Sequence, residues 1–307
     1  MAPPPSRRAV LLAGGATLAA CVAPERRAAA PPEPAVSPRA LRLRTRGAHH
    51  GFIRRMVSPG DLGEHLKPFI FLDHVAGEVR PGMGFPFHPH SGIATLTYVR
   101  DADVDYEDTT GKAGVLRAGG LEWMMAGGGV WHRGGVVPSV PRLHGFQLWV
   151  AMPEAHEEAP AHSLYVPPEE VPERDGVRVL LGRYGELRSP VPAPSSMNYL
   201  DVHLPPGARW TYEPPPDHRV AWCFVHEGSA RANGEALHDT LAVFEEGAGP
   251  IAFEALTASR VLLGSAAPHP HPLVLGTSSV HTSVAALRRS LGRIRDLGLA
   301  LQREGRA

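Results

Sequence analysis

Three histidines have the residue type and spacing of metal ligands. His88 and His90 are separated by one residue in the run Phe85-Pro86-Phe87-His88-Pro89-His90. Residues two apart in an extended chain point to the same face, so both imidazoles can bind one ion. His132 follows about 40 residues later, after a Gly-rich turn at 126–129. Three imidazoles around a divalent ion leave positions open for water or a substrate, as in catalytic rather than closed structural sites.

The elements that position these histidines are predicted to be short strands. The segment after His90 is β-branched and aromatic from 93 to 99, which is typical of a strand. The chain has 33 Gly and 32 Pro, so many turns are expected. Apolar residues recur at helical spacing only near the C-terminus, at 284, 287, 291, 294, 297 and 301, where Thr282 or Ser283 would cap a helix. The chain is therefore predicted to be all-β with one C-terminal helix.

Composition excludes some function classes. The chain has 31 basic and 31 acidic side chains, with no basic stripe, so we expect no nucleic-acid partner. It has two cysteines, Cys21 and Cys223, and therefore no disulfide framework. Cys223 lies in an apolar run at 220–225 and is predicted to be a small buried side chain.

The N-terminus has the features of an export signal. Arg7 and Arg8 precede a short apolar run that ends in Leu18-Ala19-Ala20-Cys21, which looks like a lipobox. We predict a signal at 1–21, lipidation of Cys21 and a disordered Ala/Pro-rich tether at 22–40. The paired arginines favour the twin-arginine route, and the Sec route remains the alternative. The mature protein would then be a membrane-anchored lipoprotein on the periplasmic side or the cell surface.

The sequence of residues 41–160 resembles that of the pirin family. The resemblance rests on Phe69-Ile70-Phe71-Leu72-Asp73-His74, on the HxH strand, on Leu121-Glu122-Trp123-Met124 before the third histidine, and on Leu143-His144-Gly145-Phe146-Gln147-Leu148-Trp149. It implies a bicupin fold of two antiparallel β-barrels. The expected domains are an N-terminal cupin at 41–160 with the metal site, a metal-free C-terminal cupin at 161–275, and a helix and tail at 276–307.

The resemblance also implies a site with one divalent transition metal held by His88, His90 and His132. Iron is favoured by the family, and imidazole ligands are equally compatible with zinc, nickel or copper. Pirins carry a glutamate two residues after the third histidine, where this chain has Gly134, and another four residues after the second histidine, where it has Ala94. Three neutral imidazoles would leave the ion its full +2 charge and make bound water more acidic.

Other side chains are candidates for the same site. Glu122, Glu107 and His144 are candidate bases or additional ligands. Four large side chains are candidate cavity walls, with plain core packing as the alternative role, namely Phe87, Trp123, Met125 and Trp131. A second histidine pair, His269 and His271, lies between prolines and is predicted to be an exposed loop.

Three functions are compatible with these observations. The first is a quercetinase-type, metal-dependent dioxygenase that acts on a catechol- or flavonol-like small molecule. The second is a metal- or ligand-binding lipoprotein without turnover. The third is a structural cupin that has lost its metal together with the two glutamates. We expect a monomer whose only membrane contact is the lipid at Cys21.

Overall fold

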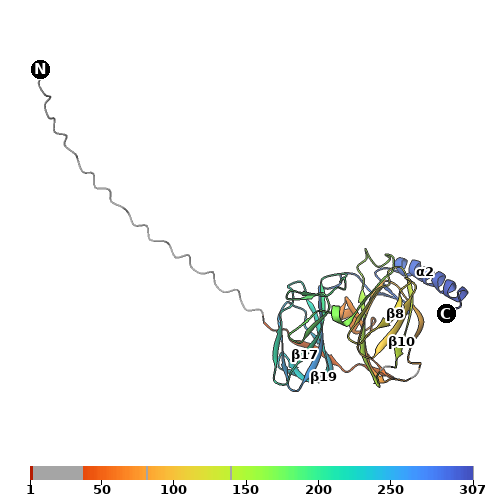
Figure 1. The fold of residues 1–307 in the computed structure, drawn as a ribbon, viewed down its shortest axis with the longest axis horizontal. Helices are drawn as coiled ribbons and strands as arrows, with labels where there is room; N and C mark the ends of the chain where they lie inside the picture. The colour runs from red at the N-terminus through yellow and green to blue at the C-terminus, as the bar shows by residue number, and fades with distance from the viewer. Residues whose placement is uncertain (3–36, 81, 139, 307) are drawn as a thin grey trace. The chain divides into compact units, whose positions relative to one another are not determined.

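The computed structural model describes residues 1–2, 37–80, 82–138 and 140–306. The predicted signal, the lipidated Cys21 and most of the predicted tether lie outside these residues and remain predictions. The compact unit begins at residue 36 and contains two β-barrels and a C-terminal helix, which confirms the predicted bicupin architecture (Figure 1). No helix in the described part of the chain is long and apolar enough to cross a membrane.

The N-terminal barrel consists of two antiparallel sheets. The seven-stranded sheet has the order β12 (His162–Val166), β9 (Leu121–Met125), β6 (Ile93–Asp101), β11 (Arg142–Ala151), β4 (Phe69–Glu78), β3 (Ile53–Val57) and β2 (Ala48–His50). The four-stranded sheet has the order β5 (Gly84–His90), β10 (Val130–Val137), β7 (Asp103–Asp108) and β8 (Ala113–Leu116). A short helix, α1 (Leu62–Leu66), precedes β4.

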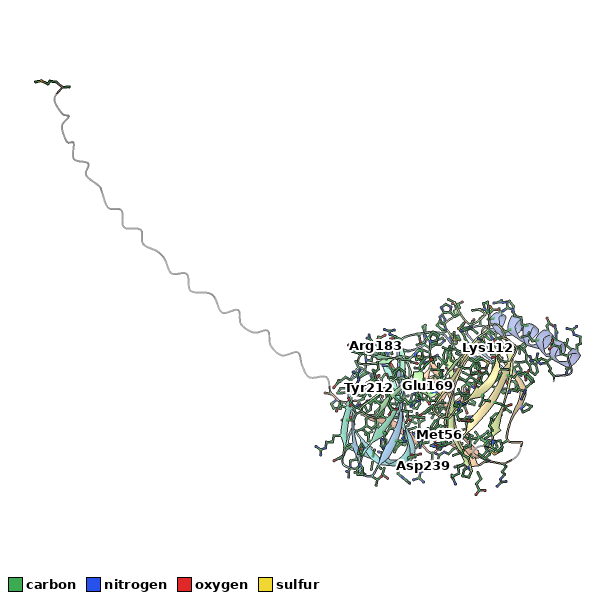
Figure 2. All side chains as sticks on the ribbon, in the orientation of Figure 1. Met56, Lys112, Glu169, Arg183, Tyr212 and Asp239 are labelled. Carbon is green, nitrogen blue, oxygen red and sulfur yellow. The ribbon has the colours of Figure 1, made fainter. Side chains whose placement is uncertain are left out.

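The C-terminal barrel is formed by one nine-stranded antiparallel sheet. Its main order is β1 (Leu41–Thr45), β20 (Glu235–Phe244), β19 (Val220–Ala232), β22 (Ser259–Ala266), β17 (Met197–Leu204), β14 (Val177–Leu181) and β13 (Glu173–Arg174), and β21 (Ile251–Ala255) pairs with β19 and with β18 (Arg209–Tyr212). The hairpin between β19 and β20 turns at Asn233 and Gly234, both at positive φ, as the Asn-Gly signal predicts. Figure 2 shows side chains in both barrels, with Tyr212 in this one and Lys112 in the other.

The remaining elements are short or terminal. They are η1 (Pro168–Glu170), the ribbons β15 (Arg183–Tyr184) with β16 (Leu187–Arg188) and β23 (Val274–Leu275) with β24 (Val280–His281), and the helix α2 (Val284–Arg303). The side chain of Ser283 accepts a hydrogen bond from the backbone of Ala286 and caps α2, which confirms one of the two predicted caps.

Two strands, β1 and β12, lie in the other barrel from the one to which the predicted domain boundaries assign them. β1 pairs with β20, so the first strand of the predicted N-terminal domain lies in the sheet of the C-terminal barrel. β12 pairs with β9, so the N-terminal barrel continues past residue 161. The predicted tether also ends early, because Arg39 is buried and donates hydrogen bonds to the carbonyls of His218 and Gly249. Sequence position alone does not reveal such an exchange of strands.

The C-terminal helix buries a face that overlaps only partly with the predicted stripe, since Ile294 and Leu301 belong to both. Its buried residues are Ala286, Ser290, Ile294, Gly298 and Leu301, whereas Val284 and Leu291 of the predicted apolar stripe are exposed. Small residues allow the helix to approach closely, and Trp131 of β10 packs against Gly298. α2 lies against β10, β23 and β24 on the side of the N-terminal barrel, rather than across both barrels as predicted (Figure 1).

One hydrophobic cluster joins the two barrels. It contains Phe146 and Phe69 from the N-terminal barrel together with Trp222 and Phe224 from the C-terminal barrel. Phe69 and Trp222 meet edge to face at 5.7 Å. Because this cluster spans the boundary, the barrels form one unit, and polar side chains at its edge are buried between them. We call this boundary the seam.

Because histidines are buried at the seam, we expect the metal-free protein to lose stability in acid. Burial and the neighbouring His144 lower the pKa of His74 to about 3, and burial and His226 lower the pKa of His144 to about 4. In the unfolded chain both imidazoles bind protons below about pH 6.5, so the unfolded state binds more protons between about pH 6.5 and 4. The free energy of unfolding should therefore fall as the pH decreases from 7 to 5.

Urea denaturation in EDTA at the two pH values measures this slope, which is at most about 1.4 kcal/mol per pH unit for each histidine. Other buried histidines contribute to the slope in the same direction. The variant His74→Phe should therefore reduce the slope by the contribution of one histidine. His49→Ala, in the exposed strand β2, should leave it unchanged. A stability that is equal at pH 7 and pH 5 would contradict this expectation.

Candidate metal centre

The three predicted ligands converge inside the N-terminal barrel because of strand pairing. β5 carries His88 and His90, and it pairs with β10 so that His88 and His132 lie directly opposite each other. One nitrogen of each imidazole lies within 4.8 Å of those of the other two. The ring centroids are 4.3 to 5.1 Å apart. The structure thus brings His132 next to two histidines that lie about 40 positions earlier in the chain.

Each imidazole has an oxygen partner at Nδ1. His88 Nδ1 lies 2.8 Å from the carbonyl oxygen of Pro86, and His90 Nδ1 lies 2.9 Å from that of Ser278. His132 Nδ1 lies 3.6 Å from Oε1 of Glu122. The two carbonyl oxygens can only accept, so they place the proton of His88 and of His90 on Nδ1 and leave the lone pair of Nε2 for a metal. The Glu122 carboxylate lies on the Nδ1 side of His132, but beyond hydrogen-bond distance. Nε2 of His132 is buried and has no hydrogen-bond partner among the described residues.

Burial keeps the rings of His88 and His90 neutral. Burial and the neighbouring His132 lower the pKa of His88 to about 4, and burial lowers the pKa of His90 well below its usual range. Neutral imidazole is the form that binds metals. The trio of His88, His90 and His132 therefore has the proximity that a divalent transition metal requires, two of its rings have the tautomer and charge as well, and the residues fit the ion that the sequence implies.

The shell around His90 comes from the end of the chain. Ser91 lies opposite Ser279 in an isolated parallel bridge, and its hydroxyl lies 3.0 Å from Nε2 of His281. His281 Nδ1 is 3.4 Å from the buried carboxylate of Glu157. These side chains are a serine, a histidine and a carboxylate in series, but Ser91 is fully buried, so no substrate can reach it. Their effect is to hold 278–281 against His90.

Of the three other candidates, the structure places only Glu122 at the trio. Glu122 lies on β9, lines the same cavity and accepts a hydrogen bond from Thr97 at 2.9 Å. Glu107 on β7 forms ion pairs with Arg133 and Arg306 instead. His144 lies at the seam, beside Glu227. Glu122 is therefore the one acidic candidate that can orient a metal-binding ring.

We expect the substitution Glu122→Gln to weaken metal binding about 10- to 100-fold, because the partner of a ligating histidine fixes its tautomer and orientation. Competition with a chelator measures this affinity. Glu107→Gln is the matched control, since Glu107 is a carboxylate of the same barrel that does not line the cavity. Equal affinities for the two variants would contradict the orienting role of Glu122.

The two positions at which pirins carry glutamates, Gly134 and Ala94 in this chain, have different surroundings. Gly134 lines the cavity beside the trio. Ala94 is fully buried in the core and does not line the cavity, although strand alternation continued from His90 would place it on the face of the histidines. The reason is local: β5 ends at His90, Gly92 adopts a φ of +71°, and β6 starts in the other sheet. Alternation of faces does not continue across such a break.

The cavity at the trio is mainly aromatic. Its volume is about 300 Å³, and its apolar wall includes Phe71, Phe85, Phe146 and Trp149. Phe71 and Trp149 stack at 4.1 Å, and Trp149 also contacts the His90 ring at 5.0 Å. The cavity thus presents flat rings, which suit a planar ligand.

The four side chains predicted as walls lie elsewhere. Trp123 is 1% exposed in the core that joins the barrels, and Met125 packs against that core. Trp131 donates a hydrogen bond to the carbonyl of Ile294 in α2 at 2.8 Å. Phe87 lies beside the guanidinium groups of Arg133 and Arg306. Trp123 and Met125 thus have the alternative role of core packing, since alternation defines two faces of a strand but not which face encloses the cavity.

The other predicted histidine pair is not exposed. His269 and His271 lie in a loop, as expected, but His269 is buried, and burial and the neighbouring His271 lower its pKa to about 4. The predicted burial of Cys223 is confirmed, since its thiol is inaccessible inside the C-terminal barrel.

Comparisons with known proteins agree with this architecture. The Pirin family model matches residues 52–150. A Pseudomonas aeruginosa protein named "Putative quercetin 2,3-dioxygenase" is 32% identical over 80% of this chain and 91% of its own length. A pirin-like protein from Caulobacter vibrioides is 33% identical over 68% of this chain and 78% of its own length.

Among solved structures, a quercetin 2,3-dioxygenase from Acinetobacter baumannii has a similar fold, with a TM-score of 0.77 at 24% identity over 83% of this chain and 96% of its own. A bacterial pirin from Escherichia coli in complex with nickel(II) has a TM-score of 0.58 at 24% identity, over 72% of this chain and 95% of its own. Sequence identity over most of both chains, the bicupin fold and the histidine trio agree: this chain belongs to the pirin family.

Proposed function

We propose that this protein is a quercetinase-type dioxygenase that holds one divalent transition metal with His88, His90 and His132 and acts on a flavonol- or catechol-like molecule. One observation carries the proposal: the three imidazoles lie in the wall of a cavity of about 300 Å³ that is lined with aromatic rings. The names of the Pseudomonas and Acinetobacter relatives support the reaction class.

A bound metal would supply Lewis acidity and positions at which adjacent oxygens of the substrate and dioxygen can meet. The protein supplies the rest. Phe71 and Trp149 offer flat surfaces against which a planar ring can pack, and the cavity excludes water from one side of that ring. The neutral imidazoles leave the charge of the ion uncompensated, so an ionised hydroxyl of the substrate is attracted strongly.

Polar side chains at the cavity could select the substrate's oxygens. The hydroxyl of Thr97 lies 2.9 Å from Oε2 of Glu122 and 3.0 Å from Oε1 of Gln147, and its single proton can be donated to one of these oxygens at a time. The amide nitrogen of Gln147 is buried and has no hydrogen-bond partner among the described residues. It is therefore available to donate to a carbonyl or hydroxyl oxygen of a ligand. Glu122 is positioned to accept a proton from a hydroxyl group in the same cavity.

Oxygen uptake tests this proposal. The full chain, loaded in turn with iron, nickel, cobalt, copper and manganese, should consume dioxygen when quercetin is added with at least one of these metals. Trp149→Ala should raise the KM for quercetin more than it lowers kcat, because the ring contributes packing rather than chemistry. The absence of oxygen uptake with flavonols and catechols for every metal would contradict the dioxygenase proposal.

A non-catalytic metal- or ligand-binding protein is the second candidate. Gly134 favours it, because the ligand set at the trio lacks the carboxylate that pirins place at this position. Flavonol binding without oxygen uptake, detected by quenching of tryptophan fluorescence in the metal-loaded protein, would support this candidate instead.

A further inference from the structure

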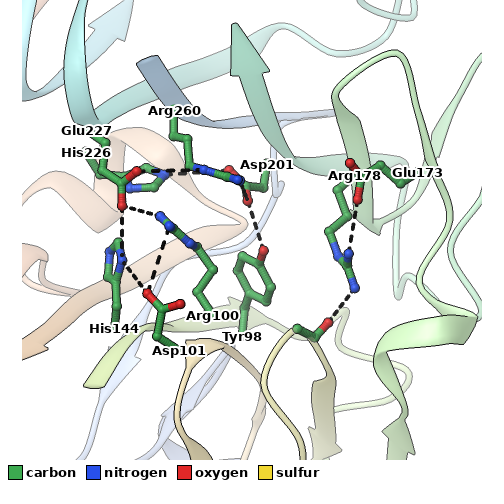
Figure 3. Close-up of polar contacts among 11 residues, drawn as sticks. Tyr98, Arg100, Asp101, His144, Glu173, Arg178, Asp201, His226, Glu227 and Arg260 are labelled. Carbon is green, nitrogen blue, oxygen red and sulfur yellow. Dashed lines mark hydrogen bonds and ion pairs between the residues drawn. The ribbon is translucent and has the colours of Figure 1, made fainter. Parts of the chain in front are cut away.

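A second group of metal-binding side chains lies at the seam. It consists of His144 on β11 of the N-terminal barrel and of His226 and Glu227 on β19 of the C-terminal barrel (Figure 3). One ligand atom from each residue lies within 4.8 Å of those of the other two. Nδ1 of His144 is 3.4 Å from Oε1 of Glu227. Two ligands of a tetrahedral ion with bonds of 2.0–2.1 Å are separated by about the same distance, roughly 3.3 Å.

An irregularity in β19 explains how two consecutive residues can both contribute. In a regular strand, His226 and Glu227 would point to opposite faces. The pairing of β19 with β22 shifts its register between Val225 and Glu227, and the pairing with β20 shifts between Val225 and Ser229. Such a bulge re-aims side chains and is common beside functional sites.

The histidines of this group have few partners. The side chain of His226 is fully buried, and neither of its ring nitrogens has a hydrogen bond among the described residues. Its Nε2 lies 3.6 Å from Oδ1 of Asp201, which leaves Nδ1 free. Nδ1 of His144 is the nitrogen near Glu227, so an ion shared with Glu227 would bind there and not at Nε2, which is buried without a hydrogen bond to any described residue. Buried polar groups without partners are costly, so a ligand at this position would stabilise the seam.

We propose that His144, His226 and Glu227 form a second metal site, which binds a divalent cation such as Zn²⁺ between the two barrels. Two imidazoles and one carboxylate are a ligand set that Zn²⁺ and related first-row ions accept. Because the ligands come from both barrels, the bound ion would cross-link them. The expectation that the C-terminal barrel takes no part in metal binding would then be wrong, since it supplies two of the three ligands.

The charges around the site favour a cation. Three carboxylates lie at the group, from Asp101, Asp201 and Glu227, against the two guanidinium groups of Arg100 and Arg260. With neutral imidazoles the sum is three negative and two positive charges, a net of −1. Burial and His226 lower the pKa of His144 to about 4, so protons do not compete for this ring near neutral pH.

Two further contacts define what binding requires. Asp201 lies 3.6 Å from Nε2 of His226, so with Nδ1 as the ligand atom this carboxylate would orient the ring, as carboxylates do for metal-binding histidines in known sites. Arg100 forms a hydrogen bond with Oε1 of Glu227, so the ion must displace this contact. Arg100 also lies 3.9 Å from Asp101 and can retain a carboxylate partner there. The side chains of Asp101 and Glu227 are about half exposed, at 50% and 41%, which gives an ion access from solvent.

The experiment isolates this site from the histidine trio. Full-length protein with the substitutions His88→Ala and His90→Ala, free of a purification tag and stripped with EDTA, is dialysed against Zn²⁺, and bound zinc is measured by elemental analysis. We expect about one equivalent of zinc per chain and an increase in Tm when Zn²⁺ is added. Adding Glu227→Gln to this background should remove both effects, as should His144→Gln from the opposite barrel.

Glu235→Gln is the matched control, because Glu235 is an exposed carboxylate on β20 that pairs with Arg44, and it should change neither effect. Circular dichroism establishes that each variant is folded. The proposal is overturned if the His88→Ala/His90→Ala protein binds no zinc, or if its zinc is retained after both Glu227→Gln and His144→Gln. These outcomes do not depend on whether the trio is catalytic.

Discussion

Replacing both His88 and His90 with alanine is expected to reduce metal-dependent oxygen uptake at least about 1000-fold, a loss of about 4 kcal/mol of transition-state stabilisation. Removing two of three imidazoles leaves His132 alone, and one imidazole cannot hold an ion against chelation by a substrate. The double substitution is preferred to a single one, since two remaining histidines could retain some metal. The rate of oxygen consumption with quercetin measures the effect.

The matched control is the double variant His49→Ala/His50→Ala, which removes an exposed histidine pair from β2 of the same barrel. It should keep full activity. Because His90 is buried, the active-site variant must also be shown to be folded, by its far-UV circular dichroism and its Tm. A folded His88→Ala/His90→Ala protein with undiminished oxygen uptake would exclude the trio as the catalytic metal site.

The second large effect is expected at the seam. Asp201 on β17 is almost fully buried and accepts a hydrogen bond from Tyr98 of the opposite barrel at 2.9 Å and from Arg260 at 3.3 Å. Burial raises the pKa of Asp201, but His226, Arg260 and Tyr98 outweigh it, so the net pKa is lowered. Asp201→Ala would leave the Tyr98 hydroxyl buried without an acceptor and would remove the carboxylate beside the buried His226 ring. We expect a loss of about 3–5 kcal/mol in the free energy of unfolding.

Urea denaturation at pH 7 measures this loss. Tyr98→Phe removes one of the hydrogen bonds and should cost about 1 kcal/mol, while Asp201→Asn, which keeps the shape and removes the charge, should fall between the two. The lowered pKa of Asp201 has a further consequence. Its contribution is present at neutral pH and is lost as the pH falls below the ordinary range of aspartate, so the variants and the parent protein should converge in stability in acid. A loss below about 1 kcal/mol for Asp201→Ala would show that the seam depends on apolar packing alone.

The sequence was sufficient to predict the trio because its signal is local. His88 and His90 share a face by strand alternation, and the resemblance to the pirin family connected them with His132. The all-β architecture, the Asn233-Gly234 hairpin and the Ser283 cap followed from equally local signals. These features depend on residues within a few positions of one another, where backbone geometry determines which side chains meet.

The features that the sequence did not predict depend on contacts between distant segments. The exchange of β1 into the C-terminal barrel and the support of His90 by Ser278 join residues about 190 positions apart or more. The seam was missed for the same reason. His144 was a candidate for the histidine trio rather than for the seam, and no local pattern indicates that the strands of the two barrels bring it next to His226 and Glu227.

Errors in the prediction of faces have a common cause. Trp123 and Trp131 were predicted to line the cavity from strand alternation, but one face of each strand packs in the core or against α2. In α2 the true buried face contains Ala286, Ser290 and Gly298, because close packing selects small residues there over the larger Val284 and Leu291. Hydrophobicity identifies apolar positions, whereas packing distance determines which of them are buried.

The central claim is that three imidazoles inside the N-terminal barrel hold a transition metal. Its most direct test is elemental analysis of the untagged Glu227→Gln protein, in which the proposed seam site is disabled. The account predicts about one transition-metal ion per chain, lost when His88→Ala and His90→Ala are added. A Glu227→Gln protein that contains no metal and takes up none, or whose metal survives the loss of both histidines, would contradict it.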